Sequence, residues 1–317
     1  MADKPETLRD RQMFGWRVAS DLPLPEWPAW SPEDTTEPNL FITLDTVPPA
    51  PAGATAVSRL VSHTPDGFRA DVPGVAAALV AANGRRVVLD IRVGASPAAV
   101  RAMIGGPILT LSALARGWLP FRWSTVEVHG HTIALGGAAG CGASTLAAAL
   151  VRRTGSLIAD EVTILRTESE AALVASGAAE IKLWPDSVAA LALSGAIVRS
   201  GQDDHRRGHR PPPRAALSVP SAGTRARRLD AVYLIQPHFP VGTVPLTWTD
   251  TTAHLAAGLR DHTLAAGLLG RQTLGTALAT LASTVRVRTV GRGQGFADLD
   301  RAVAAVLVDQ GVAADGR

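Results

Sequence analysis

A glycine-rich segment, Gly136–Thr145 with the sequence GGAAGCGAST, constrains the fold of this chain more than any other feature. Residues Thr132–Leu135 before it have the composition of a buried β-strand, and residues Ser144–Arg153 have that of an alanine-rich helix. Glycines let the backbone N–H groups of such a loop turn inward, and the helix N-terminus adds partial positive charge. A strand, a glycine loop and a helix in this order predict an α/β P-loop domain that binds an anion such as phosphate.

The loop fits the Walker A pattern G-x-x-x-x-G-K-[ST] except at its lysine. Gly137 and Gly142 match the two glycines, Ser144 matches the hydroxyl residue, and Ala143 stands in place of the lysine. Phosphate binding can survive this change, but losing a charge-assisted contact to the transferred phosphate costs roughly two to three orders of magnitude in rate. The residues predicted to contact a nucleotide are Gly137, Gly140, Cys141, Gly142, Ala143, Ser144 and Thr145.

Few residues can replace the missing lysine, because only Lys4 and Lys182 among the 31 lysines and arginines are lysines. Lys182 lies on a predicted strand, Glu180–Leu183, from which its side chain reaches either the phosphate site or, as lysines usually do, the solvent. Arginines between residues 199 and 228 are a second source of charge, either as a finger over the phosphate or as part of a solvated basic loop. These alternatives stay open at the level of sequence.

Asp160 and Glu161 follow a short apolar strand, Leu157–Ala159, and are candidate ligands of a metal ion. Neighbouring side chains on an extended strand face opposite ways, so both acids reach one metal ion only if the strand ends there. Otherwise they are surface acids that cap a turn. Ser144 is either a magnesium ligand or a cap of the helix, and Cys141 is either a thiol activated by the helix N-terminus or a small packing residue.

The composition excludes several classes of protein. A net charge of +3 over 317 residues gives no intense positive field, so a nucleic-acid partner is not indicated. One cysteine forms no intrachain disulfide, and Met1–Trp16 lacks the apolar core of a signal peptide, so we expect a cytoplasmic protein. The uncharged run Thr132–Val151 has the length of a membrane span, but its four glycines identify it as the glycine loop, and no membrane partner is expected.

The chain divides into two predicted parts. Residues 1–95 form a β-rich N-terminal lobe, in which Asn83-Gly84 between two apolar runs is a strong hairpin signal. Residues 96–317 form the P-loop domain, whose first helix starts at Ser96-Pro97. Within this domain, residues 199–228 are rich in arginine and proline and form a predicted mobile basic loop.

Together these features resemble the HPr kinase/phosphorylase superfamily, particularly its shorter members that phosphorylate serine in peptides, such as lasso-peptide precursor kinases. The resemblance covers most of the chain. It rests on the order and spacing of FGWRV at 14–18, LPLP at 22–25, the two strands that lead into the glycine loop, LIADEV at 157–162 and KLWPDS at 182–187. It implies an HPr-kinase-like fold that binds ATP or another nucleotide together with Mg²⁺. Ser144 and Asp160 would then bind the magnesium ion, and the paired acids Asp160 and Glu161 would supply the base.

Two departures from the family pattern fall at the expected active site. Ala143 replaces the loop lysine, and Arg122 stands where relatives carry a histidine, although an arginine is not a base at neutral pH. Two functions therefore stay open. The first is an ATP-dependent kinase that acts on a serine or threonine of a peptide or small protein in a biosynthetic pathway. The second is a catalytically inactive pseudokinase that binds a peptide or a partner enzyme, with or without nucleotide. The resemblance also implies homo-oligomers.

Overall fold

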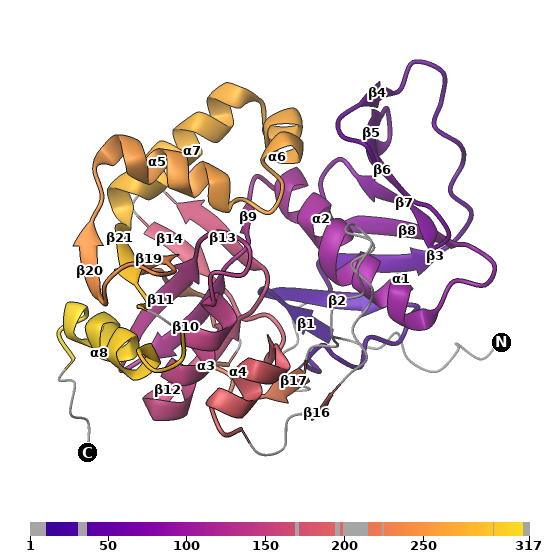
Figure 1. The fold of residues 1–317 in the computed structure, drawn as a ribbon. Coiled ribbons are helices and arrows are strands. Elements are labelled where there is room, and N and C mark those ends of the chain that lie inside the picture. Colours follow the sequence, from indigo (N-terminus) through magenta and orange to yellow (C-terminus); the bar gives the residue numbers. More distant parts are fainter. Residues whose placement is uncertain are drawn as a thin grey trace. The chain divides into compact units, whose positions relative to one another are not determined.

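The computed structural model describes residues 11–30, 37–168, 171–193, 197–198, 215–223, 225–293 and 295–312. The chain folds into two compact units (Figure 1). The first unit comprises Met1–Pro120 and Arg260–Gly275, and the second comprises Phe121–Leu259 and Thr276–Arg317. The sequence predicts a boundary at residue 95, whereas the first unit runs on to Pro120 and takes in a second, separate segment.

An eight-stranded sheet in the order β1-β2-β3-β8-β7-β6-β5-β4 forms the first unit and confirms the predicted β-rich N-terminal region. Its strands are β1 (Arg11–Met13), β2 (Trp16–Ser20), β3 (Leu40–Leu44), β4 (Thr55–Ala56), β5 (Val61–Thr64), β6 (Gly67–Val72), β7 (Ala76–Ala81) and β8 (Arg86–Ile91). The pairs β2–β3 and β3–β8 are parallel, and the other pairs are antiparallel. The helical elements of this unit are α1 (Pro97–Met103), the π-helical turn η1 (Ile104–Ile108), α2 (Leu109–Ala115) and α6 (His262–Leu269).

The boundary lies beyond residue 95 because α2 packs on the turn between β7 and β8. That turn is the hairpin predicted from Asn83-Gly84, with Gly84 in the left-handed region at φ 67°. A Cβ atom on Gly84 would lie 2.4 Å from the carbonyl oxygen of Ser112 in α2, so only glycine allows this approach. The helix after Ser96 therefore belongs to the first unit.

One stretch of helix in the described residues, Pro97–Ala115, is long and apolar enough to cross a membrane by length and composition. Buried positions make up 61% of its most apolar part, as in the core helix of a folded domain. The run Thr132–Val151 is not a single helix, because it divides into a strand, the glycine loop and a helix.

A six-stranded sheet in the order β12-β10-β11-β19-β21-β20 forms the centre of the second unit. Its strands are β10 (Ser124–Val128), β11 (His131–Gly136), β12 (Gly155–Ala159), β19 (Ala231–Gln236), β20 (Gly242–Pro245) and β21 (Arg286–Gly291). The three central strands β11, β19 and β21 are parallel, whereas the flanking strands are antiparallel to their neighbours. The carboxyl ends of the three parallel strands therefore lie along one edge of the sheet, where ligands bind in open α/β sheets.

Two smaller sheets and five helices complete the described elements. The four-stranded sheet has the order β18-β14-β13-β9 and the three-stranded sheet the order β15-β17-β16. Their strands are β9 (Leu119–Phe121), β13 (Thr163–Glu168), β14 (Ala171–Val174), β15 (Glu180–Leu183), β16 (Ile197–Val198), β17 (Ala215–Ser218) and β18 (Arg227–Arg228). The helices are α3 (Ala143–Thr154), α4 (Pro185–Ala190), α5 (Trp248–Gly258), α7 (Arg271–Thr284) and α8 (Leu299–Asp309). These elements give the mixed α/β fold expected from the sequence.

The span 199–228 differs from its prediction as one continuous loop. Ala215–Ser218 forms β17, which pairs antiparallel with β15, and Arg227–Arg228 forms β18, which pairs with β14. These strands are too short to show the alternation of apolar and polar residues that marks a longer strand. They are therefore not recognisable within a span rich in arginine and proline. Residues 199–214 and 224 lie outside the described residues.

Helices α3 and α8 pack against each other and against the central sheet. Their apolar residues include Leu146 and Leu150 of α3 and Val303 and Val306 of α8, all fully buried with Tyr233 of β19. Hydrophobic burial on this scale fixes the start of α3 relative to the ends of β11 and β19. The glycine loop is therefore held between two buried elements.

A polar cluster closes the far end of this core. The Tyr233 hydroxyl donates to Asp309 Oδ2 at 2.5 Å, and Gln310 Nε2 donates to the Tyr233 oxygen at 2.5 Å. Arg288 Nε lies 3.1 Å from Asp309 Oδ1, and the Asp309 side chain is only 9% exposed. Burial raises the pKa of Tyr233, and the hydrogen bond that its hydroxyl donates to Asp309 raises it further.

The last residue of β11, Gly136, meets the indole ring of Trp123. A Cβ atom on Gly136 would lie 2.2 Å from Trp123 Cδ1, and the ring cannot move aside because it is buried and stacked on Phe121 with centroids 3.8 Å apart. The strand before the loop therefore requires glycine at its end.

We expect Gly136→Ala to lower the free energy of unfolding by about 1–3 kcal/mol, the cost of inserting a methyl group into a packed core. Urea unfolding measures this change. Gly275→Ala is the matched control, because Gly275 lies in α7 with no atom within 4 Å of its Cβ position, and it is expected to be neutral or slightly stabilising. Equal unfolding midpoints for Gly136→Ala and the unsubstituted protein would contradict this packing.

Candidate functional site

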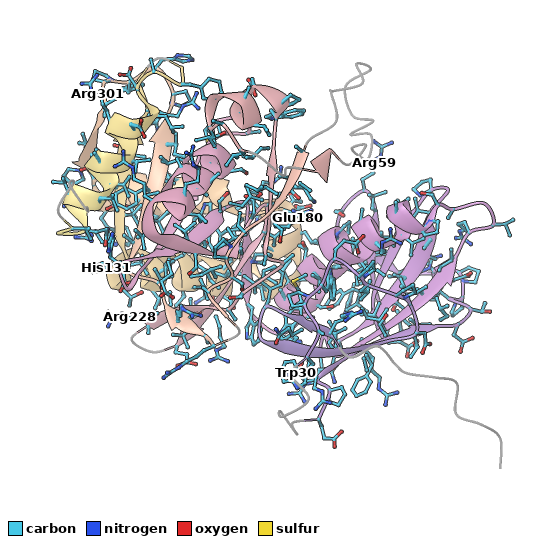
Figure 2. All side chains as sticks on the ribbon, turned by 90° about the horizontal axis from the view of Figure 1, so that it is seen from below. Trp30, Arg59, His131, Glu180, Arg228 and Arg301 are labelled. Carbon is cyan, nitrogen blue, oxygen red and sulfur yellow. The ribbon has the colours of Figure 1, made fainter. Side chains whose placement is uncertain are left out.

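The glycine loop runs from the end of β11 to the start of α3, at the edge where the parallel strands end. His131, labelled in Figure 2, marks the start of β11. Gly137, Gly140 and Gly142 have φ angles of 141°, 83° and 95°, a backbone region that other residues rarely adopt. Gly142 is the N-cap of α3, and no side chain caps this helix. The backbone therefore has the form of a phosphate-binding loop, in which N–H groups at the helix start stay available to an anion.

The side chains of Cys141 and Thr145 are buried under the loop. Cys141 Sγ lies 3.7 Å from the carbonyl oxygen of Gly136, and burial raises the pKa of this thiol, which keeps it protonated. The structure thus favours the packing role of Cys141 over an activated nucleophile. Thr145 Oγ1 lies 3.0 Å from Ser187 Oγ and ties α3 to α4. Because both side chains are buried, each residue can contact a ligand only through its backbone atoms.

Asp160, after the end of β12, collects three hydrogen bonds from three different elements. Ser124 Oγ donates to Oδ1 at 2.6 Å, and Ser144 Oγ donates to the same oxygen at 2.8 Å. The backbone N–H of Lys182 donates to Oδ2 at 3.0 Å. Ser144 therefore binds Asp160 and does not cap α3. Asp160 is half-buried and joins the loop helix to β10 and β15, so it is not a surface acid that caps a turn.

The environment of Asp160 disfavours its ionised form. Burial is the largest cause that raises its pKa above the ordinary value of 3.8, and the neighbouring charge of Glu161 raises it further. The hydrogen bonds from Ser124, Lys182 and Ser144 act in the opposite direction but do not cancel the effect of burial. A half-buried carboxylate of this kind gains from a nearby cation.

A tight turn places Glu161 on the same side as Asp160. Glu161 has φ 63°, and Val162 N donates to Asp160 O at 2.7 Å, which makes a three-residue γ-turn. Glu161 Oε2 accepts from Lys182 Nζ at 2.7 Å. The strand thus ends before Asp160, which is the condition for both acids to reach one site. Asp160 accepts from the backbone N–H of Lys182, and Glu161 accepts from its side chain.

Lys182 is close to the loop but is already engaged. It lies on β15, whose first residue Glu180 is labelled in Figure 2, and its side chain is 46% exposed beside Glu161. The structure therefore brings together Ser144, Asp160, Glu161 and Lys182. Arg122 is exposed on the strand edge before Trp123, and its backbone N–H donates to Gly258 O at 2.9 Å.

Ala143 occupies the first position of α3. Its methyl group is partly buried against the core cluster and carries no charge or hydrogen-bonding group that could contact a ligand. A residue that sequence analysis missed lies close by. Arg292 follows β21, and a Cβ atom on Gly142 would be 2.6 Å from Arg292 Nη1. The only sequence signal is an arginine between two glycines, Gly291 and Gly293, directly after an apolar strand.

The donor set fits Mg²⁺ held together with phosphate. The described residues contain no group of three or more His, Cys, Asp or Glu side chains that could hold a metal ion by themselves. Mg²⁺ is usually held by one or two protein oxygens, with substrate phosphates and water as the remaining ligands. Ser144 Oγ and Asp160 Oδ1, 2.8 Å apart at the start of the loop helix, are the matching pair.

Comparisons with known proteins show little similarity in sequence. No family model matches the chain, and no curated protein matches it. Among solved structures, the Hpr(Ser) kinase/phosphatase from Coxiella burnetii is similar with 12% sequence identity, over 61% of this chain and 95% of that chain, at a TM-score of 0.30. This is a distant structural likeness.

Proposed function

We propose that this chain is a kinase-like P-loop protein that binds ATP with Mg²⁺ and transfers phosphate to a serine or threonine of a peptide or small protein. The observation that carries the proposal is the convergence of Ser124, Ser144 and the Lys182 N–H on Asp160. Hydroxyl and carboxylate oxygens at the start of a P-loop helix are the groups that hold magnesium in P-loop enzymes. A loop that served packing alone would not need a half-buried carboxylate there.

Each residue has a chemical part in the proposal. When bound, Mg²⁺ neutralises charge on the phosphates and ATP supplies the phosphoryl group. The loop N–H groups hold phosphate oxygens, while Ser144 and Asp160 hold the ion. Glu161, which is 30% exposed beside Lys182, accepts the proton of an incoming hydroxyl, and Lys182 keeps the Glu161 side chain in place.

A second candidate function is a pseudokinase that binds a peptide or a partner enzyme. One observation favours it: Ala143 removes the lysine that normally contacts the transferred phosphate. The two candidates differ in their products. An active kinase leaves phosphorylated serine or threonine on a peptide from a library, whereas a pseudokinase binds without forming it.

Calorimetric titration with ATP tests the nucleotide part of the proposal. We expect binding that requires Mg²⁺ and that Ser144→Ala weakens about tenfold, because the variant removes one oxygen ligand and one hydrogen bond to Asp160. Ser283→Ala is the matched control, since Ser283 is an exposed hydroxyl residue of α7 that donates to Thr280 O. No heat of binding at millimolar ATP, with and without Mg²⁺, would rule out the proposal.

A further inference from the structure

Arg292 reaches the glycine loop from a strand far along the chain. β21 lies parallel to β19, which lies parallel to β11, so the residue after β21 emerges at the edge where the loop begins. The Arg292 backbone is held there by a hydrogen bond from its N–H to Gln236 O at 3.3 Å. The fold thus places an arginine at the ligand-binding edge of the sheet.

The guanidinium group lies against the last glycine of the loop. Arg292 Nη1 and Cζ would be 2.6 Å and 3.2 Å from a Cβ atom on Gly142, so a side chain there would displace the arginine. In this position the positive charge of Arg292 is close enough to the thiol of Cys141 to oppose the rise of its pKa that burial causes. The positive charge of Arg292 therefore lies beside Gly142, the residue that precedes Ala143.

This arginine has no partner among the described residues. Its Nε is buried without a hydrogen bond, and no carboxylate of the described residues forms an ion pair with it, whereas Arg288 of β21 forms an ion pair with Asp309 at 3.1 Å. The nearby N-terminus of α3 is also positive. A cation without a counter-ion beside a helix N-terminus is unfavourable. An anion bound in the loop would interact favourably both with Arg292 and with the N-terminus of α3.

We infer that Arg292 supplies the positive charge that Ala143 removes, by binding the phosphate oxygens of a nucleotide held in the loop. The inference rests on the proposed function for the identity of this ligand. A guanidinium group presents several N–H donors in one plane and pairs with phosphate through two of them, so arginine is chemically suited to this place.

Equilibrium binding of ADP and of inorganic pyrophosphate, both with Mg²⁺, tests the inference. We expect Arg292→Ala to weaken both ligands about tenfold to a hundredfold, the effect of losing a charge-assisted hydrogen bond, and to leave adenosine binding unchanged. Arg286→Ala removes the same charge from the opposite, exposed end of β21 and is expected to change neither affinity. Thermal unfolding checks that each variant is folded, and Arg292→Gln, which keeps the length of the side chain, replaces Arg292→Ala if that variant does not fold.

A rescue variant makes the test specific to the missing lysine. Adding Ala143→Lys to Arg292→Ala is expected to recover most of the lost affinity, whereas Ala143→Lys alone is expected to change affinity less than threefold, because the charge is already present. Unchanged ADP and pyrophosphate affinities in Arg292→Ala, with Ser144→Ala still weakening ATP, would overturn this inference and leave the proposed function standing. Loss of pyrophosphate binding in Arg292→Ala, in a protein that binds no nucleotide, would support the anion role of Arg292 and overturn the nucleotide function. A protein that binds neither ligand would overturn both.

Discussion

Asp160→Asn is expected to lower Mg²⁺-dependent phosphoryl transfer by a factor on the order of 10²–10³ and to raise the melting temperature of the ligand-free protein. The substitution removes the negative charge that would hold the magnesium ion. It keeps the shape of the side chain, and the hydroxyls of Ser124 and Ser144 can still donate to its amide oxygen, whereas the Lys182 N–H, which donates to the other carboxylate oxygen, loses its acceptor. The variant also removes the cost of a half-buried charge, a gain of roughly 1 kcal/mol of the kind common when functional residues are replaced.

The gain in stability has a defined pH dependence. Burial raises the pKa of Asp160 above its ordinary value of 3.8, so the folded protein holds this proton more tightly than the unfolded chain. The contribution of the protonated group is complete below the unfolded value and is lost as the pH rises through the folded value. The difference in melting temperature between Asp160→Asn and the unsubstituted protein should therefore be smallest in acid and grow toward neutral pH.

Scanning calorimetry at several pH values measures the melting temperatures, and a phosphopeptide assay with ATP and Mg²⁺ measures the rate of phosphoryl transfer. Asp300→Asn is the control, because its carboxylate is 86% exposed and contacts Arg153 at the surface. It should change neither quantity. A melting difference for Asp160→Asn that stays constant from acid to neutral pH would show that the Asp160 carboxylate is not buried as described.

Asp309→Ala is expected to destabilise the second unit by about 3 kcal/mol, the largest effect on stability that we expect from a single substitution. It leaves the Tyr233 hydroxyl, which otherwise donates at 2.5 Å, without its acceptor and the guanidinium of Arg288 without its ion-pair partner. Breaking a buried pair by removing one partner costs about 3–5 kcal/mol, and the lower end applies because the Arg288 side chain is 27% exposed.

Urea unfolding of Asp309→Ala and of Asp300→Ala provides the comparison, since both residues belong to α8 and lose the same carboxylate. The exposed Asp300 is expected to contribute under 1 kcal/mol. Asp309→Asn, which keeps an acceptor for Tyr233, should recover part of the loss. Equal unfolding free energies for the two alanine variants would show that the polar cluster of Tyr233 and Asp309 adds nothing to stability.

Local features of the fold are predictable because their signals lie within a few residues. The Asn83-Gly84 hairpin forms as predicted, and Ser96 caps α1 by accepting from Ala99 N at 3.1 Å. The alanine-rich pattern over 263–281 favours a single helix, but the structure has two, because Gly270 adopts φ 80° and ends α6. A glycine with this φ is the usual end of a helix, but the alanine-rich sequence on both sides masks it.

Site residues that belong to a local motif can be predicted from the sequence. Site residues that reach the loop only through strand pairing in the sheet cannot. Ser144 and Asp160 each follow from a local pattern, and the structure joins them at 2.8 Å. Arg292 is separated from Gly142 by some 150 residues, and only the parallel order β11-β19-β21 makes them neighbours. No local pattern encodes that order, since it depends on which apolar strands pair across the whole unit.

The division of the chain into its two units has a consequence for synthesis on the ribosome. The first unit needs Arg260–Gly275 as well as Met1–Pro120, and the second unit needs residues after Thr276 as well as Phe121–Leu259. Neither unit can therefore complete its packing until most of the chain has left the ribosome, although domains often fold in order from the N-terminus as they emerge. The apolar strand β19, for example, is made before its parallel partner β21. We therefore expect a greater dependence on chaperones during synthesis than for a chain whose units are contiguous.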